Sequence, residues 1–158
     1  MDLNAIIPII NKWHQSHYRV VLVTGVFDLL HSEHLQFLSK AKAAGDKLVV
    51  GIESDVRVKQ IKGPNRPINS EPIRLKQIQA LKPVDLAFIL PEAFTSSIDH
   101  ERLIQLIKPQ TLAVSSHTKH LAKKRAICQK YGTTVQIVHS HNPHTSTTQL
   151  IRSQNRHP

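Results

Sequence analysis

Short apolar runs alternate with amphipathic stretches along the chain. Five runs are rich in β-branched residues and short enough for buried strands, and they cover residues 19–24, 47–53, 84–90, 111–114 and 133–138. Helical spacing or helix-start signals mark the intervening stretches, at residues 3–15, 31–44, 98–107, 119–131 and 146–153, with shorter helices after Asp55 and Ser70. Strands separated by helices pair in parallel. The pattern therefore predicts an α/β fold, a three-layer α/β/α sandwich with a five-stranded parallel sheet.

The length and composition fit one domain over residues 1–158. A chain of 158 residues with 40% hydrophobic and 20% charged residues is typical of a folded globule and not of a disordered segment. Residues 1–17 would form an N-terminal helical extension. Its apolar stripe, which includes Ile6, Ile10 and Trp13, could pack on its own sheet or on a second subunit, so a homodimer is possible.

Three features bear on location. No apolar run approaches the roughly 18–20 residues that span a bilayer, so we expect no membrane segment. The first ten residues carry no basic residue and no small-residue cleavage site, which disfavours a secretory signal. A lone cysteine, Cys128, excludes an intramolecular disulfide and leaves no thiol pair for a structural zinc site. We therefore expect a reducing, cytoplasmic location.

The net charge of +10 is unevenly distributed. Residues 1–101 carry 12 basic and 11 acidic side chains, whereas the remainder carries nine basic and no acidic side chains. This asymmetry suggests that the last third faces nucleotide phosphates, RNA or an acidic partner. A solvated basic helix face over residues 119–130 would explain many of the same lysines.

Candidate chemistry follows the first strand, since open α/β sheets bind ligands at the carboxyl ends of their strands. Gly25 permits a sharp turn and close approach to a ligand, and Asp28 precedes the next helix. His31 and His34 lie at the first turn of that helix, where free N–H groups attract phosphate. Two imidazoles there can stabilise charge that develops in a transition state. A metal site or a helix-capping role for either histidine is the alternative.

Several motifs in chain order resemble the cytidylyltransferase-like nucleotidyltransferases. The string G-x-F-D-x-x-H-x-x-H at residues 25–34 resembles their signature. The string K-G-P-N-R-P-I-N at residues 62–69, with Arg74 behind it, resembles the branch that acts on heptose 1-phosphate. The string S-T-T-Q-L-I at residues 146–151 resembles the motif that opens the last helix. The resemblance covers about residues 19–153 and implies a Rossmann-like fold of the nucleotidyltransferase type.

The resemblance implies transfer of an NMP group from a nucleoside triphosphate to a small sugar phosphate or polyol phosphate, with release of pyrophosphate. Residues 62–69 favour ATP, whereas the short chain resembles the glycerol-phosphate type and favours CTP. Mg²⁺ is expected with the triphosphate. The alternative is a degenerate nucleotide-binding sensor of the same fold. RNA binding is disfavoured because the chain has only seven aromatic residues, without basic–aromatic interleaving.

The resemblance also assigns roles to individual residues. The predicted catalytic residues, which would contact or neutralise phosphate groups, are His31, His34, Lys62 and Arg74. The predicted nucleotide-binding residues are Gly25, Val26, Phe27, Asp28, His117, Thr145, Ser146 and Thr147. Asp28 would orient groups around the histidines or help to place the metal, and no residue is assigned as a resident metal ligand.

Purely structural roles are the alternatives for several of these residues. Phe27 could belong to the core, and Arg74 could cover its helix and pair with Glu71. Lys62 could be solvated in a flexible loop, and Ser146 or Thr145 could be a simple N-cap.

The chain departs from the family pattern around this site. Glu33 stands where the family has glycine between the two histidines. Repulsion between unit charges 4 Å apart is about 4 kcal/mol at an effective dielectric near 20, so Glu33 should weaken triphosphate binding unless it points away or helps to bind Mg²⁺. His117 replaces the usual aspartate after the fourth strand, and histidines recur over residues 139–144. We hypothesise that His117, His141 or His144 answers Glu33 in a variant but active site.

Overall fold

Five parallel strands form the sheet, and the computed structural model describes them within residues 1–140. The strands are β1 (Val20–Gly25), β2 (Lys47–Ile52), β3 (Leu86–Ile89), β4 (Thr111–Ser115) and β5 (Thr134–His139). Their order is β3-β2-β1-β4-β5, and every neighbouring pair is parallel. This arrangement confirms the predicted fold class. The chain reverses its winding direction between β1 and β4, so their carboxyl ends flank the expected ligand crevice.

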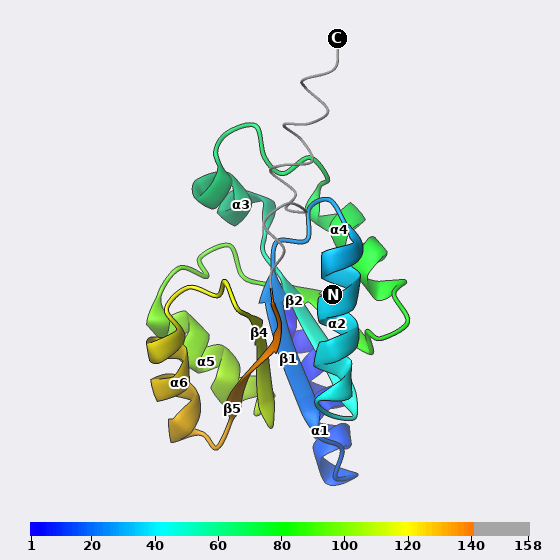
Figure 1. Cartoon of the computed structure of the whole chain (residues 1–158), viewed down its shortest axis with the longest axis vertical. Coiled ribbons are helices and arrows are strands. Elements are labelled where there is room, and N and C mark those ends of the chain that lie inside the picture. Colours follow the sequence, from blue (N-terminus) through cyan, green and yellow to red (C-terminus); the bar gives the residue numbers. More distant parts are fainter. Residues whose placement is uncertain (141–158) are drawn as a thin grey trace.

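Helices cover both faces of the sheet (Figure 1). Over the described residues these are α1 (Leu3–Gln15), α2 (Ser32–Ala43), α3 (Asp55–Lys62), α4 (Glu71–Gln79), α5 (Ser97–Ile107) and α6 (Leu121–Lys130). Helices α2 and α4 pack on one face, and α1, α5 and α6 pack on the other. Within residues 1–140, each strand, and each helix whose range was predicted, lies within two residues of that range. The helix predicted at residues 146–153 lies outside the described residues.

The side chains of β1 show why its run of apolar residues is continuous. Val20 and Leu22 join the core beneath α1, α5 and α6. Val21 and Val23 point to the opposite face and join the core beneath α2 and α4. Successive side chains of a strand alternate between faces, so a strand covered on both sides needs apolar residues at every position. The carboxyl end of β1 is thereby fixed from two sides.

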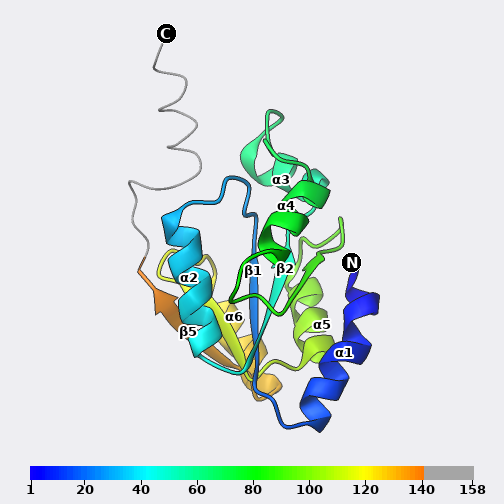
Figure 2. The same cartoon turned by 90° about the vertical axis from the view of Figure 1, so that its right-hand side faces the viewer.

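Helix α1 packs on its own sheet, which is one of the two expected alternatives. Ile6 and Ile10 are fully buried in the core shared with α5. The backbone N–H of Ile89 donates to the carbonyl oxygen of Met1 at 3.1 Å. Figure 2 shows α1 beside α5 along one face of the sheet. The first helix is therefore part of the main core.

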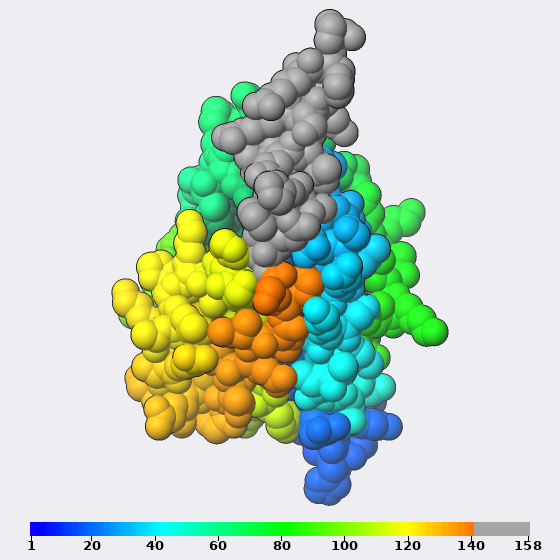
Figure 3. Space-filling view, in the orientation of Figure 1, coloured from blue at the N-terminus to red at the C-terminus, as the bar shows by residue number. Residues whose placement is uncertain are grey.

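Helix α2 also contacts the far edge of the sheet. It packs against β5 as well as against β1, β2 and β4. In the space-filling view, the cyan surface of α2 lies directly beside the orange surface of β5 (Figure 3). Within residues 1–140 no helix has the length and apolar character needed to cross a membrane.

Candidate functional site

A cavity of about 490 Å³ opens at the carboxyl ends of β1 and β4. Its polar wall comes from the β1–α2 connection, the end of α3 and the turn after β4. Its apolar wall comes mainly from β1, β4, α5 and α6, through Leu22, Leu103, Ile104, Leu112, Ile127 and Cys128. The cavity therefore lies where the reversal of strand order places a ligand site.

His31 and His34 lie together on the wall of this cavity. Their rings are stacked, with centroids 3.8 Å apart and planes 21° apart. The edge of the stack rests on Phe27, whose ring centroid lies 5.4 Å from that of His34. His31 is the N-cap residue of α2 by its backbone, but its side chain makes no capping hydrogen bond. Both imidazoles therefore belong to the wall of the cavity at a helix N-terminus.

Gly25 and Phe27 form the support beneath the histidines. Phe27 is buried and adopts a left-handed backbone conformation with φ of 51°. A Cβ atom at position 25 would lie only 2.8 Å from the Phe27 ring. Glycine is therefore required at position 25 for close approach of this ring, and not for a positive φ of its own. Phe27 belongs to the core beneath α2, which agrees with the alternative role considered for it.

Asp28 holds the 62–69 loop in place. Its buried carboxylate accepts hydrogen bonds from Arg66 Nε at 3.0 Å and from the backbone N–H groups of Ile68 and Asn69, both at 2.8 Å. The Asn69 amide donates back to the Asp28 carbonyl oxygen at 2.9 Å. The structure therefore shows Asp28 organising this loop from the wall of the cavity, and its predicted role around the histidines or a metal stays a prediction.

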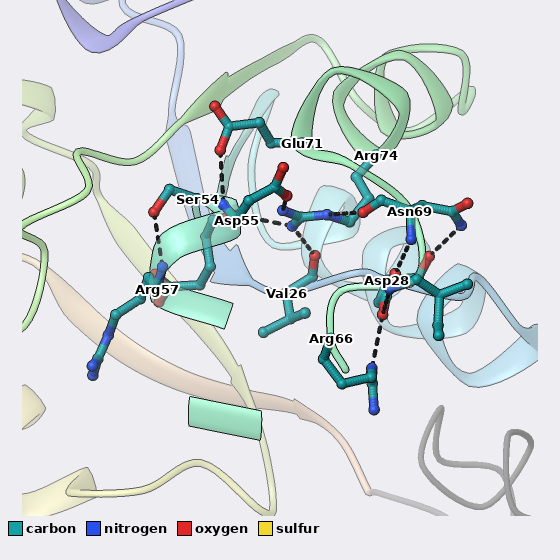
Figure 4. Close-up of polar contacts among 11 residues, drawn as sticks. Val26, Asp28, Ser54, Asp55, Arg57, Arg66, Asn69, Glu71 and Arg74 are labelled. Atoms are coloured by element: carbon teal, nitrogen blue, oxygen red, sulfur yellow. Dashed lines mark hydrogen bonds and ion pairs between the residues drawn. The ribbon is translucent and has the colours of Figure 1, made fainter. Parts of the chain in front are cut away.

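Arg74 lies behind the cavity and is fully buried. Figure 4 shows its guanidinium at the centre of a network that joins the ends of β1 and β2 to α3 and α4. It donates to four oxygens at 2.8–3.0 Å, which are the carbonyls of Val26, Glu53 and Asn69 and Asp55 Oδ1. In this conformation the guanidinium is held by protein oxygens and does not line the cavity in which the predicted phosphate groups would bind. Arg74 is a positioning residue.

The alternative pairing of Arg74 with Glu71 is not formed either. The Glu71 carboxylate instead accepts a hydrogen bond from the backbone N–H of Asp55 at 2.7 Å. Asp55 is the first residue of α3, so α3 and α4 are tied together at their starts. The sequence contained the charges of this network but not their pairing.

Four cationic side chains, Lys62, Arg66, Lys119 and Lys124, line the cavity. Partial burial lowers the pKa of the Lys62 ammonium, and the nearby charges of Arg66 and Lys119 lower it further, whereas Asp28 raises it. Arg66 is buried, and its Nη2 has no hydrogen-bond partner within residues 1–140. Like charges gathered beside a cavity are the arrangement expected where an anion binds.

Arg66 and Lys119 are absent from the residues predicted for the site. Arg66 stands inside the string at residues 62–69, so the motif carried a signal that could have identified it. In the sequence, Lys119 is only one of many basic residues near α6. Its place at the cavity depends on the turn after β4, which the sequence did not define in detail.

The turn after β4 brings further polar groups to the cavity. His117 lines it, as predicted, and is exposed. Lys124 donates to Thr118 Oγ1 at 2.5 Å, and burial lowers the pKa of the Lys124 ammonium. Thr145, Ser146 and Thr147, predicted to bind nucleotide, lie outside the described residues, as do His141 and His144.

Glu33 has a described partner that the sequence hypothesis did not name. Its Oε2 lies 2.5 Å from His139 Nε2, at the end of β5. Lys40 Nζ lies 3.0 Å from the other ring nitrogen of His139. The pairing needs α2 beside β5, an arrangement that residues separated by about a hundred positions do not reveal from the sequence.

The cavity gathers most of the predicted site. Among the predicted residues that the structure describes, those on the cavity wall are Gly25, Val26, Phe27, Asp28, His31, His34, Lys62 and His117, and Arg74 is not on it. Within residues 1–140, no group of three or more histidine, cysteine or acidic side chains is arranged to hold a metal ion. The arrangement suits an extended anion beside an apolar wall.

Known proteins resemble the chain over most of its length. Residues 22–155 match the family described as "Cytidylyltransferase-like". Bifunctional protein HldE from Rhodopseudomonas palustris is 32% identical over 149 residues, which cover 94% of this chain and 29% of that protein. Bifunctional protein HldE from Sulfurimonas denitrificans is 41% identical over 104 residues, which cover 66% of this chain and 21% of that protein. The chain thus spans less than a third of the length of these two curated relatives.

Solved structures show the same fold. The lipopolysaccharide core biosynthesis protein from Thermoplasma volcanium has a TM-score of 0.64 and 33% sequence identity, and the match covers 77% of this chain and 95% of that one. Pantothenate synthetase from Thermus thermophilus has a TM-score of 0.57 at 17% identity, and the match covers 82% of this chain and 59% of that one. The second likeness concerns the fold alone.

Proposed function

Because the chain belongs to the cytidylyltransferase-like family, we propose that it transfers the NMP group of a nucleoside triphosphate to a small sugar phosphate. A phosphate oxygen of the acceptor attacks the α-phosphorus in line. The bond between the α-phosphorus and the oxygen bridging to the β-phosphate breaks, and pyrophosphate leaves with that oxygen. No covalent intermediate with the protein is needed, so positioning and charge stabilisation supply the catalysis.

The stacked pair of His31 and His34 on the cavity wall carries this proposal. The pair lies at the first turn of α2, where the positive end of the helix favours an anion. Imidazole N–H groups aimed at the α-phosphate would stabilise the charge that grows on its oxygens as the acceptor attacks. Support from Phe27 keeps the rings in place before substrate binds.

The cationic wall fits the rest of the triphosphate. Lys62, Arg66 and Lys119 would neutralise the β- and γ-phosphates and the departing pyrophosphate. The bond from Arg66 Nε to Asp28 already fixes the guanidinium, so its unpaired Nη2 could donate to a phosphate oxygen with little further loss of side-chain freedom. The apolar wall between α5 and α6 would take the planar base, with Lys124 and Thr118 as nearby polar groups.

Similarity favours a sugar phosphate as acceptor. The relatives named bifunctional protein HldE and the lipopolysaccharide core biosynthesis protein are about one third identical to this chain. The 62–69 motif favours ATP, and CTP is the other nucleotide to test. A polyol phosphate acceptor, a cytoplasmic location and a homodimer are further parts of the proposal.

Mg²⁺ would enter with the triphosphate. The Asp28 carboxylate is already used by Arg66 and two backbone N–H groups, and Glu33 is paired with His139. We therefore assign the ion mainly to phosphate oxygens, where it would neutralise charge on the leaving group. Asp28 keeps the loop with Lys62 in position, whether or not the ion is bound.

Pyrophosphate release tests the proposal. The protein is incubated with Mg²⁺, each of four nucleoside triphosphates and a panel of sugar and polyol phosphates. We expect release with ATP or CTP that depends on one class of phosphorylated acceptor. Nucleotide binding without release under any pairing would identify a sensor and overturn the proposed turnover.

A matched pair of lysine variants tests the site. Lys62→Met removes a cavity charge and should lower kcat/KM by about 10- to 100-fold, the loss of a charged hydrogen bond or two. Lys59→Met removes an exposed charge from the same helix, outside the cavity, and should leave kcat/KM within about twofold. Equal effects of both substitutions would contradict the assignment of Lys62.

A further inference from the structure

Three side chains form a polar chain from α2 to β5. Glu33 Oε2 lies 2.5 Å from His139 Nε2, and Lys40 Nζ lies 3.0 Å from His139 Nδ1. The side chains of His139 and Glu33 are only 7% and 14% exposed. Glu33 and Lys40 lie toward opposite ends of α2, so one helix contacts both ring nitrogens of the same imidazole. Figure 3 shows the two elements in direct contact.

The donors and acceptors of this chain indicate which ring nitrogen of a neutral His139 carries the proton. An ammonium group has three donors and no acceptor, so Lys40 must donate and His139 Nδ1 must accept. The proton of the neutral ring then lies on Nε2 and is donated to the Glu33 carboxylate. Lys40 and Glu33 carry opposite charges, and a neutral imidazole links them. The negative charge of Glu33 is thus balanced within the protein.

The position of Glu33 makes this balance important for the cavity. Glu33 lies in the first turn of α2, directly before His34, and it lines the same cavity. An acidic residue in a first helical turn stabilises the positive end of the helix, which gives Glu33 a structural benefit. The same carboxylate would repel a triphosphate that approaches the histidines unless it is held and neutralised.

We propose that His139 and Lys40 are positioning residues that hold the Glu33 carboxylate against β5, so that the first turn of α2 can accept a nucleoside triphosphate. This inference rests on the proposed function and extends it. Glu33 is then not an obstruction, and Glu33→Gln should bind nucleotide within about twofold of the wild type. The chain also ties the helix that carries both histidines to the end of β5.

Nucleotide binding in a set of variants tests this role. The dissociation constants of ATP and CTP are measured with Mg²⁺ present, and KM and kcat are measured wherever turnover is found. His139→Ala releases Glu33 and should weaken binding at least fivefold, with a smaller effect on kcat. Adding Glu33→Gln to His139→Ala should restore binding to within about twofold of the wild type. Lys40→Met should weaken binding about two- to threefold, and its exposed position keeps this variant folded.

A matched control removes a similar contact elsewhere. Tyr131, the residue that follows α6, donates to the carboxylate of Glu101 in α5 at 2.6 Å, outside the cavity. Tyr131→Phe should leave the dissociation constants unchanged. If the three side chains only connect α2 to β5, the double variant of Glu33 and His139 should bind nucleotide no better than His139→Ala.

The outcomes separate this inference from the proposed function. Unchanged binding in His139→Ala, or no recovery in the double variant, overturns the inference even if pyrophosphate release is normal. Nucleotide binding without pyrophosphate release overturns the proposed turnover and leaves the variant series decisive. A wild-type protein that binds neither nucleotide overturns both.

Discussion

At the scale of single residues, the cavity wall depends on a close contact between Gly25 and Phe27. The ring occupies the space that a side chain at position 25 would need, and it supports His34 from below. Gly25→Ala should lower the free energy of unfolding by about 1–3 kcal/mol, the usual range for overpacking. The expected fall in Tm is about 2–4 °C per kcal/mol, measured by thermal unfolding.

The Phe27 ring provides the control for this substitution. In a Phe27→Leu background the ring atoms that meet the new Cβ are absent, so Gly25→Ala should cost less than half as much there. An equal cost in both backgrounds would show that the ring is not the cause of the strain.

Glu53 gives a prediction on pH. Its Oε2 is buried without a hydrogen-bond partner among the described residues, and burial raises the pKa of the carboxyl above 4.5, although Arg57 and Arg74 partly oppose this. The unfolded chain therefore releases this proton at lower pH than the folded protein, and stability is lost as pH rises through that window. Glu53→Gln should be more stable than the wild type at pH 7, by about 1 kcal/mol.

The difference between the two proteins should disappear below the unfolded-state pKa, where the wild-type carboxyl is neutral in both states. Urea unfolding at several pH values measures it, and all other titrating groups cancel in the comparison. A stability difference that does not change with pH would contradict a buried, charged Glu53.

At the scale of elements, the strands and the helix boundaries were predictable because they depend on residues close together in the sequence. Runs of apolar residues fixed the strands, and Gly45, Ser70 and Pro72 marked helix boundaries to within a residue or two. The pairing of Glu33 with His139 and the burial of Arg74 could not be predicted in the same way. Both depend on which helix lies beside which strand, and a charged residue in a sequence looks the same whether it faces a ligand or a backbone carbonyl.

Arg74 links four elements, and this role has a measurable consequence. Lysine in its place has a single nitrogen, which cannot reach three carbonyl oxygens and the Asp55 carboxylate together. Arg74→Lys should lower the free energy of unfolding by about 3–5 kcal/mol, as expected when a buried charge network is broken. Lys76→Met, on the exposed face of the same helix, should change it by less than about 0.5 kcal/mol. Denaturant unfolding of the two variants distinguishes this role from direct contact with phosphate, for which activity would fall without loss of stability.

At the scale of the whole molecule, the structure shows where part of the excess positive charge of the last third of the chain lies. The basic residues over 119–130 do not form one solvated helix face, because Lys119 and Lys124 line the cavity, whereas Lys130 pairs with Glu101 at 3.5 Å. Lys119 shares the cavity wall with Lys62 and Arg66, which come from the nearly neutral part of the chain. The fold thus joins charges from both parts into one positive region at the cavity.

Salt should therefore weaken nucleotide binding in a way that follows the phosphate charge. Raising the salt concentration from about 0.1 M to about 1 M shortens the Debye length from about 10 Å to about 3 Å. Over this range we expect the dissociation constant of the triphosphate to rise at least about tenfold, because the cavity attracts it through several cations. The constant for the corresponding nucleoside should change by less than about twofold, as measured by calorimetric titration.

Two neighbouring lysines identify the source of this dependence. Lys119→Met should reduce the slope of log Kd against log salt, because it removes a charge that lines the cavity. Lys123→Met removes an exposed charge that lies outside the same cavity and should leave the slope unchanged. Equal slopes for both variants and the wild type would mean that diffuse net charge, and not the cations gathered at the cavity, attracts the nucleotide. The +10 charge of the chain would then act only on encounter, since long-range attraction alters association rates more than the contacts of the bound state.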